Sequence, residues 1–168
     1  MASCNNIPKS AGASIGMVSD TLNIGKDAQF LVKFAEINLE EIQLGKLAQQ
    51  MGTTMDLKEL GEMMENDHTK SLNELTTLAL KKSITLPTSL DSNAQNDSTK
   101  LSKLSGNEFD THYCDMMVSG HKIAIALFEK ESTDASDPAI RQMAITTLPI
   151  LKKHLEQATE CQKECKKM

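Results

Sequence analysis

Four polar residues lie on otherwise apolar helical stripes, one in each of four candidate helices: Glu41, His68, His121 and His154. A helical bundle ordinarily places Leu or another apolar residue at such positions. Burying a carboxylate and three imidazoles costs several kcal/mol unless the groups are paired or coordinated. A divalent cation would compensate that cost, as it does in bundle proteins with carboxylate and histidine ligands. The four residues therefore predict a metal site between helices, and the His-rich set favours zinc or copper over iron.

Two short segments around two of these histidines are similar to each other. Residues 62–68 and 115–121 each contain an acidic residue, a Met pair, and a His four residues after the second Met. Residues four apart share a helical face, so Met64 lies beside His68 and Met117 beside His121. Thioethers and imidazoles together suit copper, especially reduced copper. Met pairs in amphipathic helices also serve as ordinary core residues, and the sequence leaves both interpretations open.

Acidic residues near the histidines are candidates for additional ligands. Glu65 and His68 have the spacing of half of a di-iron carboxylate motif, but Val and Leu stand three residues before His121 and His154. Dinuclear iron chemistry is therefore disfavoured. Glu65, Asp67 and Glu129 become ligands only if their side chains turn inward.

The cysteines and the fourth histidine carry weaker signals. Cys161 and Cys165 continue the stripe that holds His154, which indicates either a thiolate and imidazole site or simple packing of small side chains. The sequence assigns no role to Cys114. His112 lies near the start of its helix, and we interpret it as a surface or capping residue.

Composition bounds the fold class. The chain has 168 residues, few aromatics and no Trp, with Leu, Ala, Met, Glu and Lys recurring, which is typical of helical proteins rather than sheets. The net charge is -5 and the basic residues form no stripe, which argues against nucleic acid as a partner. No apolar run reaches the about 18 residues that a transmembrane helix requires.

Helical periodicity predicts an all-α fold with four helices, over about residues 27–50, 54–83, 107–131 and 138–165. We expect Asp27 to cap the first helix, Thr53 or Thr54 the second, and Asp137 the fourth, with Pro138 in the favoured first position. Pro149 should bend the last helix. Residues 1–22 are predicted to be a flexible tail, and 23–168 one four-helix bundle domain.

The segment between the second and third helices is long. Residues 84–106 are rich in Ser, Asn, Asp and Thr, and Lys100 to Leu104 are compatible with a short helix. At about 3.3 Å per residue the segment can cross the whole bundle, which is the one-crossover topology of ferritin-like folds. With a rise of about 1.5 Å per residue, the four stripe residues differ in height by about 8 Å, which is compatible with one shared site.

The sequence begins Met-Ala-Ser-Cys, which resembles the surroundings of the modified Cys in a bacterial lipoprotein. No hydrophobic signal segment precedes Cys4, so this interpretation requires that the segment is missing and that Met1 was added. The alternative is a chance Cys in a cytoplasmic tail. Lipidation at Cys4 would anchor the protein to a membrane without a transmembrane helix.

The ordered motifs of the chain resemble a bacterial ferritin-like family of exported proteins catalogued as domain of unknown function 4142. The segments that carry the resemblance include 27–31, 41–48, 63–70, 85–87, 101–106, 109–113, 116–121, 126–129, 147–149 and 154–156. The resemblance implies a ferritin-like fold and a periplasmic or outer-membrane-anchored lipoprotein. It places recurrent polar positions of the family at Glu41, Asp67, His68, Asp110, His121, Glu129 and His154. Gly120 departs from the acidic residue that usually precedes the third-helix His.

The primary hypothesis is an exported bundle that binds a divalent metal for binding, storage or stress protection, without catalytic turnover. One alternative is a structural or interaction bundle in which Glu41 and the three histidines form a buried hydrogen-bonded network. Another is a ferritin-like oxidoreductase with a dinuclear centre. No protein partner is indicated.

Overall fold

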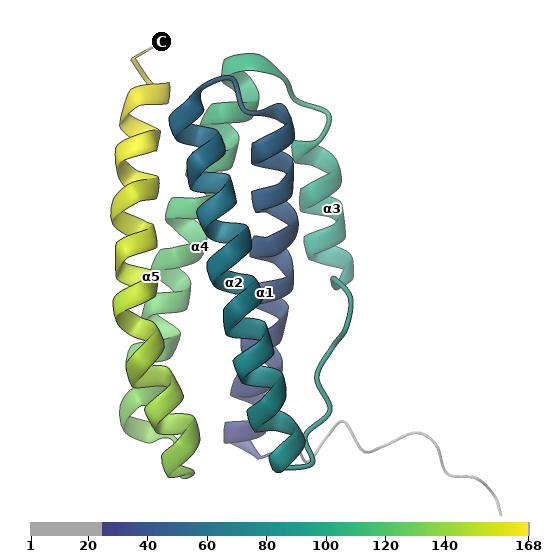
Figure 1. Ribbon diagram of the computed structural model, residues 1–168, viewed down its shortest axis with the longest axis vertical. Coiled ribbons are helices and arrows are strands. Elements are labelled where there is room, and N and C mark those ends of the chain that lie inside the picture. Colours follow the sequence, from purple (N-terminus) through teal and green to yellow (C-terminus); the bar gives the residue numbers. More distant parts are fainter. Residues whose placement is uncertain (1–24, 168) are drawn as a thin grey trace, which may run out of the picture.

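The computed structural model describes residues 25–167, and these residues form five α-helices and no strand (Figure 1). The prediction of an all-helical chain is confirmed. The helices are α1 (Lys26–Met51), α2 (Met55–Lys81), α3 (Ser92–Leu101), α4 (Gly106–Asp134) and α5 (Pro138–Cys165). None of the described helices is long and apolar enough to cross a membrane.

The four long helices lie side by side, and the short α3 lies along their flank (Figure 1). α1 packs most closely against α2, and α4 against α5, while α3 contacts α1 and α4. The chain runs up α1 and down α2, returns through α3, then runs down α4 and up α5. α2 and α4 therefore run in the same direction.

The short helix of the connection differs from the one that the sequence predicted. It begins at Ser92 rather than at residue 100, because the Asp91 carboxylate caps it by accepting a hydrogen bond from the backbone N–H of Ala94. Ala94 and Leu101 are buried, and their seven-residue spacing places both on one helical face. One N-cap and two buried apolar side chains thus stabilise a helix that its polar composition does not predict.

The helix caps agree with the sequence at two sites and disagree at one. Thr54 caps α2 and Asp137 caps α5, each accepting hydrogen bonds from backbone N–H groups, with Pro138 in the first turn. The predicted cap at Asp27 is wrong, because Gly25 is the N-cap of α1. The Asp27 carboxylate instead accepts hydrogen bonds from the backbone N–H groups of Ser136 and Asp137, between α4 and α5. It therefore fastens the start of α1 to that turn.

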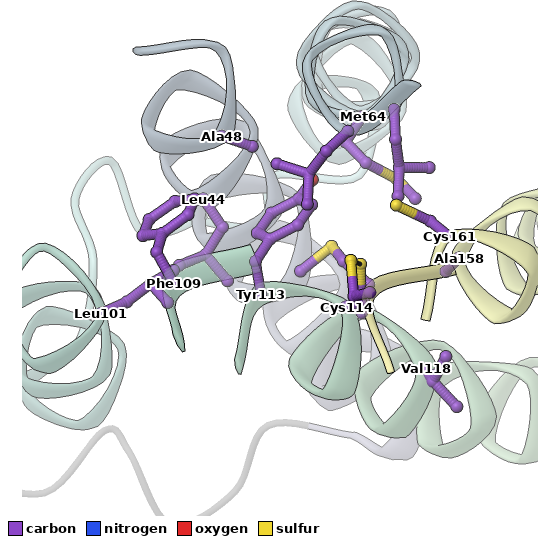
Figure 2. Packing of buried hydrophobic residues seen from close by; sticks show 14 residues of the cluster. Leu44, Ala48, Met64, Leu101, Phe109, Tyr113, Cys114, Val118, Ala158 and Cys161 are labelled. Atoms are coloured by element: carbon purple, nitrogen blue, oxygen red, sulfur yellow. Dashed lines mark hydrogen bonds between the residues drawn. The ribbon is translucent and has the colours of Figure 1, made fainter. Parts of the chain in front are cut away.

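The apolar core is divided into two clusters along the helix axes. The cluster near the α1–α2 turn includes Leu57, Tyr113 and Cys161, and Figure 2 shows part of it. The cluster near the α4–α5 turn includes Phe34 and Phe128. The buried polar residues Glu41, His68, His121 and His154 lie on the same stripes at positions between these clusters.

Two glycines allow α1 and α2 to approach closely. A Cβ on Gly45 would lie 2.6 Å from the carbonyl oxygen of Gly61, and a Cβ on Gly61 would lie 2.7 Å from the Cβ of Ala48. Both separations are shorter than real side chains tolerate, so any larger residue pushes the two backbones apart. The glycines thereby fix the position of α2, which carries His68, relative to α1.

We predict that Gly61→Ala destabilises the protein by about 1–3 kcal/mol, the usual range for overpacking. Ala normally stabilises a helix interior by up to about 1 kcal/mol relative to Gly, so the sign reports the helix contact. Urea unfolding of the metal-free protein measures the change. Gly120→Ala is the matched control, because its Cβ meets only Glu41 Oε1 at 3.4 Å. A gain in stability for Gly61→Ala would contradict the close contact.

Candidate metal centre

Three helices bring three histidines together in the middle of the core. His68 lies on α2, His121 on α4 and His154 on α5, and each is at most 3% exposed. Each offers a ring nitrogen, and these nitrogens all lie within 4.8 Å of one another. The ring centroids are 5.2–5.8 Å apart. The structure therefore brings together three of the four residues that the sequence selected, in an arrangement that could hold a metal ion.

The second nitrogen of each imidazole is held by an oxygen acceptor. His68 Nδ1 lies 2.9 Å from Asn38 Oδ1, while the Asn38 amide nitrogen donates to the Phe34 carbonyl. His121 Nδ1 lies 2.9 Å from the Met117 carbonyl oxygen, and His154 Nε2 lies 2.9 Å from Asp67 Oδ2. Each of these nitrogens must carry a hydrogen to make its bond, so the tautomer of every ring is fixed.

The remaining nitrogens then present lone pairs to one another. His121 Nε2 and His154 Nδ1 are 3.3 Å apart, and with the tautomers fixed no hydrogen lies between them in the neutral rings. His68 Nε2 is buried and has no hydrogen-bond partner. Buried nitrogens without a donor are costly, and a cation between them would satisfy all three at once. Outer oxygen partners of this kind are also the usual support of metal-binding histidines.

Burial keeps the three rings neutral at physiological pH. Burial lowers the pKa of His68 well below its usual value, with His154 and His121 adding to the effect. It lowers the pKa of His121 to about 4, and His154 contributes in the same direction. The pKa of His154 is also lowered by burial, although Asp67 opposes the shift. Neutral imidazole is the form that binds metals, so no proton needs to leave before an ion binds.

Glu41 does not join the group of converging nitrogens. Its Oε1 lies 3.7 Å from His121 Nδ1, which is the nitrogen that faces away from the other rings. Burial raises the pKa of Glu41 to about 8, so this contact is not an ion pair at pH 7, where both groups are neutral. Oε2 of Glu41 is buried without a partner. The structure therefore places Glu41 behind His121, where it can support the ring but not share an ion with His68.

The other acidic candidates lie in different surroundings. Asp67 is 40% exposed and contacts the cluster through His154. Glu65 accepts a hydrogen bond from Gln49 at 2.6 Å and lies 3.8 Å from Lys46. Glu129 pairs with Lys152 at 2.8 Å on the surface. Neither Glu65 nor Glu129 turns toward the histidines, which removes the carboxylates that a dinuclear iron centre needs.

None of the described sulfur-containing candidates joins the histidine group, and neither does His112. Met64 and Met117 are buried in the apolar cluster near the α1–α2 turn. Cys161 and Cys165 form no group with His154; they converge with Cys114 instead. Cys4 lies outside the described residues. His112 is exposed on the surface, and its Nδ1 donates to the Glu108 carbonyl.

Sequence reasoning missed Asn38, which is fully buried and orients His68. The signal was present, because Asn38 stands four residues after Phe34 and three before Glu41 on the same stripe. Asp110 is likewise fully buried and accepts hydrogen bonds from the backbone N–H and the hydroxyl of Thr53. Its role is to hold the α1–α2 turn against α4.

Comparison with known proteins identifies the family. The family model described as "Domain of unknown function (DUF4142)" matches residues 12–161, and the chain belongs to this family. No curated protein matches the sequence significantly. The crystal structure of a DUF305 fragment from Deinococcus radiodurans is similar, with a TM-score of 0.74 over 84% of this chain and 97% of that chain. The sequence identity is 9%, so this likeness shows the fold alone.

We predict that the metal-free protein loses stability on acidification below pH 6.5. The unfolded chain takes up protons at histidines that the folded state keeps neutral, so the unfolding free energy falls as pH decreases toward the folded pKa values. His121 alone should lower the unfolding free energy by about 2 kcal/mol between pH 6.5 and pH 5, at about 1.4 kcal/mol per pH unit. Glu41 acts in the opposite sense between pH 4.5 and 8 and offsets about one histidine, so His68 and His154 carry the net loss of stability. Urea unfolding with a chelator present at pH 7 and pH 5 measures the difference.

The exposed fourth histidine supplies the control for this measurement. His112→Ala should keep the full pH dependence, whereas His121→Gln should reduce it. A pH dependence that His121→Gln leaves unchanged would show that this ring is not held neutral in the folded state.

Proposed function

We propose that the protein binds one divalent transition metal ion, zinc or copper, through His68 Nε2, His121 Nε2 and His154 Nδ1. The supporting observation is that these three lone pairs converge while the opposite nitrogen of each ring already donates to an oxygen. The proposed role is binding, storage or protection from metal stress, without catalytic turnover.

The donor set favours zinc or copper. Three imidazoles suit both ions, whereas iron in helical carboxylate proteins relies on several Glu or Asp ligands. The converging group consists of histidines only, and Glu65 and Glu129 make other contacts. The ferritin-like oxidoreductase is for that reason the weaker candidate.

The buried position favours binding over turnover. His68, His121 and His154 are each at most 3% exposed, and none of them lines the hollow between α2 and α5. A catalytic metal keeps an open coordination position that substrate can reach. Asp67 is the part of the site that meets solvent.

A purely structural network accounts for less of the geometry. In such a network the buried polar atoms satisfy one another, but His68 Nε2 and Glu41 Oε2 have no partner among the described residues. A bound ion would give the buried His68 Nε2 the partner that it lacks among the described residues.

We further propose that the helices form a ferritin-like four-helix bundle with one crossover through α3, and that the protein is exported. The parallel directions of α2 and α4 support the crossover topology. Export rests on Cys4 and its small neighbours in the sequence. Mass spectrometry of the Cys4 peptide from native membranes should show a lipid-modified N-terminus; an unmodified Cys4 peptide would refute lipidation.

Metal titration tests the proposed site. Protein purified without a His tag and stripped of metal should bind one zinc or cupric ion per chain, measured by calorimetry and elemental analysis. Free ion at a hundred times the dissociation constant should stabilise the fold by about 2.7 kcal/mol. His68→Gln or His121→Gln should weaken binding by more than about 100-fold, beyond the range typical of outer partners.

Two further variants compare a residue that orients a ligand with a residue that has no contact with the site. Asp67→Ala removes the acceptor of His154 but no ligand, so metal affinity should fall by about 10–100-fold. Glu65→Gln, two residues earlier on α2, should leave affinity unchanged because its contacts are with Gln49 and Lys46. No binding by the wild type, or full affinity after both His68→Gln and His121→Gln, would rule out the site.

A further inference from the structure

A second cluster of possible ligands lies toward the end of the helices that holds the α1–α2 turn. Cys114 on α4 and Cys161 and Cys165 on α5 place their Sγ atoms within 4.8 Å of one another, and all three are buried. Figure 2 shows Cys114 and Cys161 pointing toward each other, beside Met64 and Ala158. Three thiols from two helices thus meet at one point.

The separation of two of the sulfur atoms is compatible with a trigonal metal site. The Cys114 and Cys165 Sγ atoms are 3.8 Å apart, and a disulfide requires about 2.05 Å. Three thiolates at about 2.3 Å from one central ion in a plane lie about 4 Å from each other. The observed spacing is close to this trigonal arrangement.

We propose that Cys114, Cys161 and Cys165 form a second metal site, separate from the histidines, that binds a cuprous ion through sulfur. Soft thiolate ligands are used for Cu(I), zinc and iron–sulfur clusters, and an iron–sulfur cluster is held by four cysteines. Structural zinc requires four protein ligands, and the converging group in the described part of the chain offers three.

The cluster is also reachable from the surface. A hollow of about 930 Å³ between α2 and α5 is lined by Cys161 and Cys165, with the thioether residue Met63 among its walls. Its lining has four carboxylates against two lysine ammonium groups: Asp56, Glu59, Glu160 and Glu164 against Lys163 and Lys167. The negative balance attracts cations toward the hollow, and Met63 adds a soft donor to its lining.

Hydrogen bonds connect the three thiols. A hydrogen bond from Cys114, and a second from Cys165, lower the pKa of Cys161, although burial opposes the shift. Hydrogen bonding to Cys161 and burial raise the pKa of Cys114, and burial raises the pKa of Cys165 to about 11.

The second site is distinct from the proposed histidine site. Cys114 precedes His121 by seven residues on α4, and Cys161 follows His154 by seven residues on α5. These helices are antiparallel, so both displacements point to the same end and correspond to about 10 Å. One ion cannot bridge both groups.

The test is a titration of the reduced, metal-free protein with cuprous bicinchoninate in the absence of oxygen. The wild type should remove one Cu(I) per chain from the indicator at this site and develop the ultraviolet thiolate-to-copper charge-transfer band. Cys114→Ser, Cys161→Ser and Cys165→Ser should each weaken Cu(I) binding at least about tenfold and reduce the band. Cys4→Ser is the matched control and should leave both unchanged.

The double variant His68→Gln and His121→Gln separates the two proposals. It should lose zinc binding but keep the thiolate band, and loss of the band in this variant would overturn a separate cysteine site. Alkylation with iodoacetamide gives a second measurement without any substitution, because Cu(I) should protect these three cysteines and not Cys4 of the unlipidated recombinant chain. Full labelling in the presence of Cu(I), a Cys114–Cys165 disulfide in the natively purified protein, or protection by zinc alone would likewise overturn the proposal.

Discussion

Three neutral imidazoles whose lone pairs face one another set the central constraint on this fold. A helical core usually closes around apolar side chains, but here the core is interrupted at the level of His68, His121 and His154. Apolar clusters lie on both sides of that level, so water has little access to the rings. Low polarity keeps the rings unprotonated and raises the cost of leaving their lone pairs unused.

The geometry around the rings is built from short, local contacts. Each ring nitrogen that faces away from the cluster finds an oxygen within 2.9 Å, from the helix that carries the ring or from an adjacent helix. Asn38 reaches His68 from α1 with a short side chain, and this requires α1 and α2 to lie close together. Gly45 and Gly61 permit that approach a few turns along the same pair of helices. Packing and ligand orientation are thus two consequences of one helix contact.

The sequence predicted the helical class and the three inward histidines because both follow from the 3.6-residue period, which is a local property. It failed where the deciding contact is not local. Asp27 looks like an N-cap, yet its carboxylate binds backbone groups more than a hundred residues away. Glu41 shares the histidine stripe, but its direction around α1 places it behind His121 rather than among the rings. A stripe identifies the buried face but not the angle at which each side chain leaves it.

The same limit explains why the cysteines could not be grouped from the sequence. Cys161 and Cys165 are visible as an i, i+4 pair, but Cys114 is joined to them only by the antiparallel packing of α4 and α5. That packing also orders the donors along the axis: imidazoles in the middle, the thioethers Met64 and Met117 one turn further, and thiols another turn beyond. Nitrogen donors suit divalent zinc and copper, whereas sulfur donors suit reduced copper. Because donor softness increases toward the hollow between α2 and α5, the two proposed sites would select different ions within a single core.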